Sequence, residues 1–289
     1  MLTGNPYYDI KLKKNTKVIL HAEDNGEGVE FSIEDIKRSG NLCWLSLLFC
    51  GLLIYVGRKK GFYSLISIGL TVLLITHALS PLILIGINPV LATILICIAS
   101  TAATMYLVGG FNAKSTSAVI GAMLSLLFAG LLSYITMFTA HLTGFTEENS
   151  MFLYTAHPEL DFIGITISTM ILATLGAVMD VAMSVSSSLH EIKENRPDIS
   201  AKEIFHAGIN IGRDMIGTMS NTLILAYAGG SLGLVMIIYA YSYQMHQILN
   251  MYSVAIEIMR GISGTMGIIL TVPITSLIMS VLLTQKGKK

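Results

Sequence analysis

The sequence has few charged residues. Only 12% of its 289 residues are Asp, Glu, Lys or Arg, whereas 53% are hydrophobic; soluble domains contain about 25% charged residues. The 18 basic and 18 acidic residues cancel, so no excess of positive charge is available for nucleic acid. This composition excludes an ordinary soluble domain and predicts a protein embedded in the lipid bilayer.

Cysteine and the sequence signatures of enzymes are also scarce. Cys43, Cys50 and Cys97 all lie in apolar segments, which excludes a disulfide framework and a zinc-binding spacing. Neither a His-Glu-x-x-His motif nor a phosphate-binding Gly-x-x-x-x-Gly-Lys motif is present. The His and acidic residues of the loop between His141 and Asp161 lack the tight spacing of a metal site. We therefore expect no enzyme, no metal and no cofactor.

Long apolar runs fill most of the chain. A helix of about 20 residues crosses a hydrocarbon layer of about 30 Å, and such runs cover residues 42–57, 62–84, 89–109, 115–140, 162–190, 215–242 and 261–284. Basic residues follow the first, third and fifth runs and end the chain, and basic loops face the cytoplasm. The sequence therefore predicts an all-α polytopic transmembrane helix bundle of about seven spans, N-out and C-in.

The first 38 residues have a different pattern. Three short strands are predicted at Tyr8–Leu12, Lys17–Ala22 and Val29–Ile33, and a turn at 24–28 joins the last two. We expect a β-rich extracytoplasmic tail at 1–38 and a transmembrane helical domain at 39–289. Because two or three isolated strands are marginally stable, we expect the tail to be the remnant of a larger domain in a longer protein.

Asp180 is an acid in the middle of the fifth predicted span. An ionised carboxylate is costly in hydrocarbon, so it is expected to face a bundle interior or a water-filled path and to mark a proton, ion or substrate route. Small or polar residues recur along its helix face every three or four positions: Thr166, Thr169, Ala173, Gly176, Asp180, Ser184, Ser187 and Glu191. This stripe indicates either a helix-packing seam or a seam that also carries protons or ions.

A cytoplasmic helix is predicted at about 200–213, because Ser200 and Glu203 have the spacing of a capping box. Thr218 and Asn221 follow on the sixth span as expected polar neighbours of Asp180, although an ordinary interhelical hydrogen bond also explains Asn221. Asp214 is expected near the cytoplasmic surface, at a different depth from Asp180, so no shared-proton pair is predicted.

Two groups of candidate residues result. The predicted proton or ion relay contains Asp180, Ser184, Thr218 and Asn221. The predicted interface or gating group contains Glu191, Arg213, Asp214, Glu257 and Arg260. Within the second group, a snorkelling interfacial anchor also explains Arg213, and a local ion pair also explains Glu257 and Arg260, which are three residues apart.

Several segments resemble one family of bacterial multipass membrane proteins. The chain is similar to the YibE/YibF family from about Ile33 onward, in the segments 86–89, 176–182, 186–192, 212–214, 216–223, 257–260, 264–267 and 273–275. The resemblance implies a location in the bacterial cytoplasmic membrane. The family name suggests that a second YibE/YibF-like chain, or another copy of this one, is the partner.

A shorter stretch resembles a second group of proteins. Asp180, the helix end at 194–196, and Arg213 before 218–223 are similar to the fourth-to-fifth helix region of SecD/SecF and of the resistance-nodulation-division exporters. That resemblance implies that Asp180 is a proton carrier and that Arg213 anchors the next helix at the cytoplasmic side. The chain departs from the pattern, because its spacing from Asp180 to Glu194 is about a turn longer and the large outer domain has no counterpart.

The sequence thus leads to two functional hypotheses. The first is a proton-coupled secondary transporter or exporter of unknown substrate, with Asp180 as the proton or ion carrier. The alternative is a non-transporting accessory or scaffold subunit, whose polar seam only binds the helices of a partner.

Overall fold

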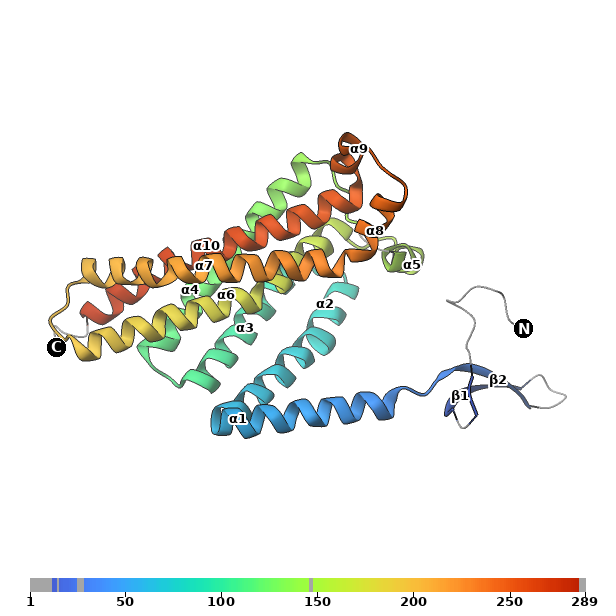
Figure 1. Cartoon of the computed structure of the whole chain (residues 1–289), viewed down its shortest axis with the longest axis horizontal. Coiled ribbons are helices and arrows are strands. Elements are labelled where there is room, and N and C mark those ends of the chain that lie inside the picture. The colour runs from blue at the N-terminus through green and yellow to red at the C-terminus, as the bar shows by residue number, and fades with distance from the viewer. Residues whose placement is uncertain (1–11, 15, 25–28, 146–147, 286–289) are drawn as a thin grey trace. The chain divides into compact units, whose positions relative to one another are not determined.

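A computed structural model describes residues 12–14, 16–24, 29–145 and 148–285 of the chain (Figure 1). Contacts divide the chain into two compact units, Met1–Leu65 and Ile66–Lys289. The boundary between them falls inside the first long helix, α1 (Ser39–Leu74).

The first unit begins with a two-stranded hairpin. Strands β1 (Val18–Asp24) and β2 (Val29–Ile36) pair antiparallel, with an irregularity between Ile19 and Leu20. The predictions of strands at 17–22 and 29–33 are thus confirmed. The strand predicted at Tyr8–Leu12 lies outside the described residues, except for Leu12. Apolar side chains of both strands are exposed, as expected for a pair of strands without a covering layer.

Helix α1 contains a break at Arg58, whose φ of 48° and ψ of −129° are not helical. Gly61 lies against the carbonyl group of Leu53 and has no room for a Cβ atom, so the chain folds back tightly after the break. The break coincides with the predicted boundary between the spans 42–57 and 62–84. A π-helical turn, η1 (Ile75–Leu79), and helix α2 (Ser80–Leu84) then continue the run.

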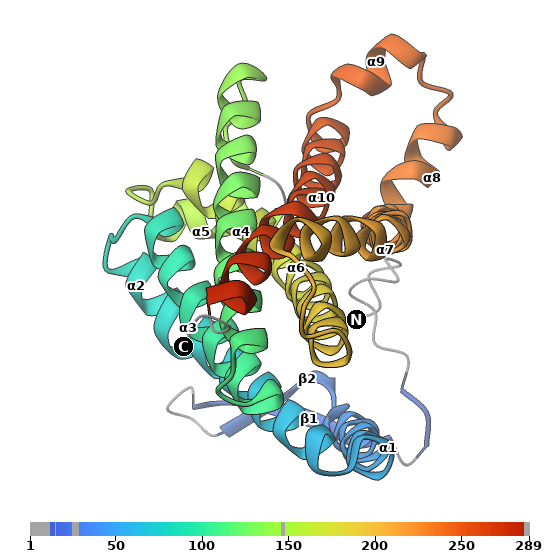
Figure 2. The ribbon, with the colours of Figure 1, turned by 90° about the vertical axis from the view of Figure 1, so that its left-hand side faces the viewer.

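The second unit is a bundle of long helices. Its elements after α2 are α3 (Pro89–Gly109), α4 (Ala113–Thr139), α5 (Glu148–Ala156), α6 (Phe162–Asn195), α7 (Ala201–Gly230), α8 (Leu232–Ala240), α9 (Met245–Asn250) and α10 (Tyr252–Gln285). Helix α10 passes between α4 and α7 and also packs against α6 (Figure 2). Helix α3 packs on the other side of α4 and α6.

Five helical runs among the described residues are long and apolar enough to cross a membrane, or six if the bent pair α7 and α8 forms one span. Helices α3, α6 and α10 contain the spans predicted at 89–109, 162–190 and 261–284, and α4 contains the span predicted at 115–140 except for its last residue. The chain is therefore a helical, multi-pass membrane protein.

Side chains that cap the helices determine where they start. The Asn112 side chain accepts a hydrogen bond from the Ser115 amide at 2.8 Å and donates one to the Gly109 carbonyl at 2.7 Å, which closes the turn between α3 and α4. Ser200 and Glu203 form the predicted capping box at the start of α7. These bonds satisfy amide groups that a helix N-terminus leaves free.

Small and hydroxylated residues fill much of the core. Ser125, Thr174 and Thr271 are buried, and each donates to a carbonyl one turn earlier in its own helix. Ser117 in α4 also makes buried hydrogen bonds to other helices, with the Ser186 hydroxyl group of α6 at 2.8 Å and with the Met279 sulfur atom of α10 at 3.2 Å. Close approach of small residues is the usual basis of helix packing in lipid.

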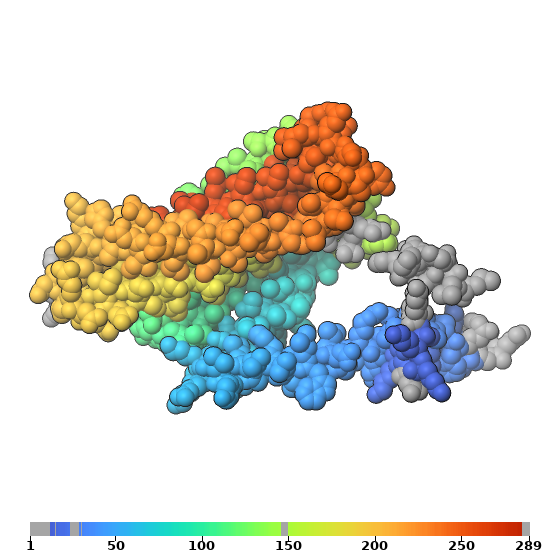
Figure 3. All heavy atoms as spheres, in the orientation of Figure 1, coloured from blue at the N-terminus to red at the C-terminus, as the bar shows by residue number. Residues whose placement is uncertain are grey.

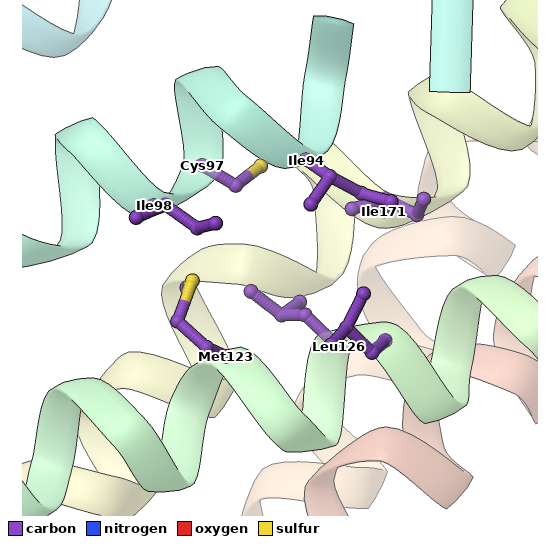
Figure 4. Close-up of a pocket in the computed structure, with 7 residues that line it drawn as sticks. Ile94, Cys97, Ile98, Met123, Leu126 and Ile171 are labelled. Atoms are coloured by element: carbon purple, nitrogen blue, oxygen red, sulfur yellow. The ribbon is translucent and has the colours of Figure 1, made fainter. Parts of the chain in front are cut away.

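A small void lies between α3, α4 and α6 (Figure 4). Its volume is about 20 Å³, and its lining is apolar, with side chains from Ile94, Cys97, Ile98, Met123, Leu126, Leu127 and Ile171. A water molecule would fit by volume but would find no polar partner, so such a void stays dry. This feature is a packing defect and not a binding site.

Helix α7 is one continuous helix through the predicted cytoplasmic helix at 200–213 and into the predicted sixth span. The chain then bends by 59° between α7 and α8. Gly229 and Gly230 end α7, and an added Cβ atom at either would have no neighbour within 4 Å among the described residues. The two glycines therefore mark the break.

Candidate functional site

Most of the stripe that contains Asp180 lies on the exposed face of α6, although Thr166 at its start is buried. Thr169, Ala173, Gly176, Asp180 and Ser184 are all exposed, whereas the opposite face of α6 is buried against its neighbours. The sequence correctly groups these residues on one face. The sequence led to the expectation that Asp180 faces a bundle interior or a water-filled path; in the single chain its face is exposed, because α6 packs through its branched apolar residues instead.

The composition of this exposed face differs from that of the other long helices. Helix α4 exposes Leu124, Leu127, Phe128 and Leu131, which suits contact with lipid. In α6, all of which the structure places, Ile163 is the only large hydrophobic residue that is exposed. Asp180 lies about 27 Å from the first residue of α6 at 1.5 Å per residue, near the middle of the helix.

Helix α7 runs antiparallel beside α6 on the face visible in Figure 3. Gly208 of α7 lies against Leu189 of α6, and Gly264 of α10 lies against both Leu223 of α7 and Thr174 of α6. These two contacts give the register of the antiparallel pair, in which Gly208 lies level with Leu189 and Leu223 lies level with Thr174.

This register places charged residues close to the depth of Asp180. Gly217 is level with Asp180, and Arg213 is level with Ser184. Asp214 is therefore within about one helical turn of the depth of Asp180. The expectation that the two acids lie at different depths, one deep and one near the cytoplasmic surface, stays a prediction, although α7 continues as an unbroken helix beside α6.

The polar residues of α7 lie on its exposed face. Thr218 and Asn221 are exposed, and the Thr218 hydroxyl donates to the Met215 carbonyl at 3.1 Å in its own helix. Among the residues placed by the structure, Asp180 has no hydrogen bond to Ser184, Thr218 or Asn221. These four residues thus lie on the exposed faces of α6 and α7.

The charged candidates near this surface are also exposed. Arg213 donates to the Asn210 side chain at 3.3 Å and forms no ion pair with an acid in the described part of the chain. Asp214 is exposed beside it, and Glu191 is exposed close to the end of α6. The faces of α6 and α7 together form a polar surface, defined by Thr169, Ala173, Gly176, Asp180, Ser184, Arg213, Asp214, Gly217, Thr218 and Asn221.

Glu257 and Arg260 form the predicted local ion pair at the start of α10. The Arg260 Nη1 atom lies 2.9 Å from the Glu257 Oε1 atom, and the two side chains are 17% and 27% exposed. The guanidinium carbon of Arg260 lies 5.9 Å from the ring centre of Tyr227 in α7. This cluster is at the end of the bundle where the Tyr252 hydroxyl accepts a hydrogen bond from the Gly144 amide at 2.7 Å.

The loop between His141 and Asp161 lies at the same end of the bundle as this cluster. His157 Nδ1 is 3.0 Å from the Glu159 carboxylate. The pKa of Glu159 is lowered by a hydrogen bond from its own amide and then by His157. Among the residues that the structure describes, no three His, Cys, Asp or Glu residues converge as metal ligands would.

The break between α7 and α8 carries a spacing that is known from enzymes. Residues Gly229–Gly233 have the Gly-x-Ser-x-Gly spacing of hydrolase nucleophile elbows, which require a strand before the turn and a helix after it. Here the motif joins two helices, and Ser231 has no hydrogen bond to a histidine in the part of the chain that is described. The surrounding structure is therefore that of a helix break.

Comparison with known proteins places the chain in a family. The family model described as YibE/F-like protein matches residues 45–285, which includes both groups of candidate residues. No curated protein and no solved structure matches the chain. The resemblance to SecD/SecF remains an expectation from the sequence. On the strength of the family match, which covers most of the bundle, the chain belongs to the YibE/F-like family.

Proposed function

We propose that this protein is a subunit of an oligomeric, proton-coupled secondary transporter of the bacterial cytoplasmic membrane, with Asp180 as the proton carrier at a subunit interface. One observation carries the proposal: α6 exposes an acid at mid-helix on a face made almost entirely of small and polar residues. The substrate is unknown.

Lipid is a poor partner for this surface. A carboxylate at the centre of a membrane helix costs about 2.5 to 3.5 kcal/mol in insertion measurements, and Arg213 and Asp214 add two more charges at similar depth. Small residues allow another helix to approach closely. A second copy of the chain, or a sister YibE/YibF-like subunit, would cover the polar surface.

Two copies related by a two-fold axis would present this surface to each other. The unpaired Arg213 of one copy could then lie near Asp180 or Asp214 of the other, so that the surface is complementary to itself in charge. Water held between the copies would connect Asp180 with Ser184, Thr218 and Asn221. In this arrangement the relay lies between subunits and not within one bundle.

The topology that we propose is seven spans, N-out and C-in. The helical run Ser39–Leu84 has 46 residues, about 69 Å at 1.5 Å per residue, which is twice the hydrocarbon thickness. Its break at Arg58 would separate two crossings, and α7 with α8 would form the sixth. Cysteine accessibility from each side of the membrane at positions 59 and 157 would test this order.

Proton flux tests the carrier role. In proteoliposomes with an imposed pH gradient, Asp180→Asn should abolish protein-dependent flux, while Asp180→Glu should retain part of it. Glu191→Gln removes an acid from the same helix face near its end and should leave most of the flux. Equal flux in wild type and Asp180→Asn would rule out the carrier role.

The absence of direct partners for Asp180 in the described chain favours a second candidate, a scaffold subunit that does not transport. There the polar surface only binds the helices of a partner. Asp180→Asn would then change the assembly of subunits but not the flux, whereas the transporter hypothesis requires the flux to fall even where assembly is intact.

A further inference from the structure

A large cavity lies where α7 ends, apart from the polar surface of α6 and α7. Its volume is about 510 Å³, and side chains from the end of α7, from α8 and α9 and from the start of α10 line it. The 59° bend takes α8 away from the line of α7, and this opens space beside α10. Cavities of about 300 to 1,000 Å³ are typical of sites for small molecules.

The walls are mainly aliphatic, from residues such as Ile224, Val235, Ile238 and Ile262. Glu257 is the one charged residue among the lining residues. Its Oε1 atom accepts the hydrogen bond from Arg260, while its Oε2 atom has no hydrogen-bond partner in the described part of the chain. A half-buried carboxylate oxygen is thus available as an acceptor in an apolar cavity.

The rest of the polar cluster is incompletely satisfied. The Arg260 Nε atom and the Tyr227 hydroxyl are buried without a hydrogen-bond partner among the residues that the structure places. Buried polar groups normally have partners. Arg260 itself lies over the Tyr227 ring and is not among the lining residues, whereas Glu257 is.

We infer that this cavity binds an amphiphilic amine, a molecule with an aliphatic body and a protonated amino head that donates to Glu257. The aliphatic walls accommodate the body. The ammonium group provides the donor that the Oε2 atom lacks and a charge opposite to that of the carboxylate. A lipid tail would fill the apolar space but would leave the Oε2 atom of Glu257 without a donor, and the Glu257 carboxylate would repel an anion. The inference does not depend on Asp180 or on transport.

The test is photolabelling of the full-length chain in nanodiscs of zwitterionic lipid. The probe is a decylamine with a diazirine on its chain, compared with the matched decanol and decanoic acid probes. Mass spectrometry should find amine adducts on α8 and on the start of α10, and unlabelled decylamine should compete. Glu257→Gln should reduce amine labelling by about tenfold, the effect of losing a hydrogen bond to a charged group, and leave alcohol labelling unchanged.

Two matched variants test whether the cavity itself is the site. Ala228 lines the cavity, so Ala228→Phe should fill it and remove labelling. Ala226 is exposed on the same helix outside the lining, and Ala226→Phe should label as wild type does. Equal labelling by the three probes would identify an ordinary lipid-filled hollow, stronger labelling by the acid would identify an anion site at Arg260, and adducts elsewhere would also overturn the inference.

Discussion

The exposed face of α6 makes a quantitative prediction about assembly. Ala173 lies on this face, about two turns from Asp180, and Ala173→Leu adds three carbon atoms there. If a second copy packs against the face, this extra bulk costs about 1 to 3 kcal/mol at each occurrence. A two-fold interface contains the residue twice, so the loss is about 2 to 6 kcal/mol. Dimerisation should then weaken by at least about 30-fold, at 1.4 kcal/mol per tenfold.

The opposite sign is expected if the face meets lipid. A leucine at a lipid-facing position favours insertion by about 0.3 to 0.6 kcal/mol, so Ala173→Leu would be neutral or slightly stabilising. Energy transfer between labelled copies, measured in bilayers over a series of protein-to-lipid ratios, separates these outcomes. Ala99→Leu, a change on the exposed face of α3, is the matched control and should dimerise as wild type does. If the Ala173→Leu variant dimerises as strongly as wild type, the proposed interface is refuted.

Three further predictions concern stability. Gly212→Leu should destabilise the bundle by about 1 to 3 kcal/mol in unfolding titrations, because α10 fills the space beside it, whereas Gly217→Leu, with open space, should not destabilise the monomer. Asn112→Ala should cost about 1 kcal/mol through loss of the α4 cap. Arg38 lowers the pKa of Asp35, so their interaction stabilises the folded state at pH values above the ordinary Asp35 pKa of 3.8. This stabilisation is lost as the pH falls through the pKa that Asp35 has in the folded state. Arg38→Gln should raise that pKa in an NMR titration.

Local signals in the sequence predicted the helices well. The capping box at Ser200, the long apolar runs and the strand pattern at 17–22 and 29–33 all depend on residues close together in the chain. The break at Arg58 also falls where the basic residues interrupt the first two apolar runs. Such features can be predicted because propensity and capping act over a few residues.

The orientation of α6 could not be predicted in the same way. Periodicity shows that Ala173, Asp180 and Ser184 share a face, but it does not show which neighbour that face meets. The structure buries Val178, Val181 and Val185 instead, so the polar face is exposed in the single chain. The position of Asp214 relative to Asp180 could not be predicted for a related reason, because the sequence has no signal for the register between α6 and α7.

The hydroxyl groups in the core have a consequence for motion. Ser125, Thr174 and Thr271 each bond to a carbonyl of their own helix, so these bonds persist when one helix slides along another. Sliding would sacrifice dispersion contacts, each worth only about 0.1 to 0.2 kcal/mol per atom pair, which can re-form after a small shift. The self-contained hydroxyl groups thus favour shear between helices, whereas the bonds of Ser117 to Ser186 and Met279 are what a slip of α4 would have to break.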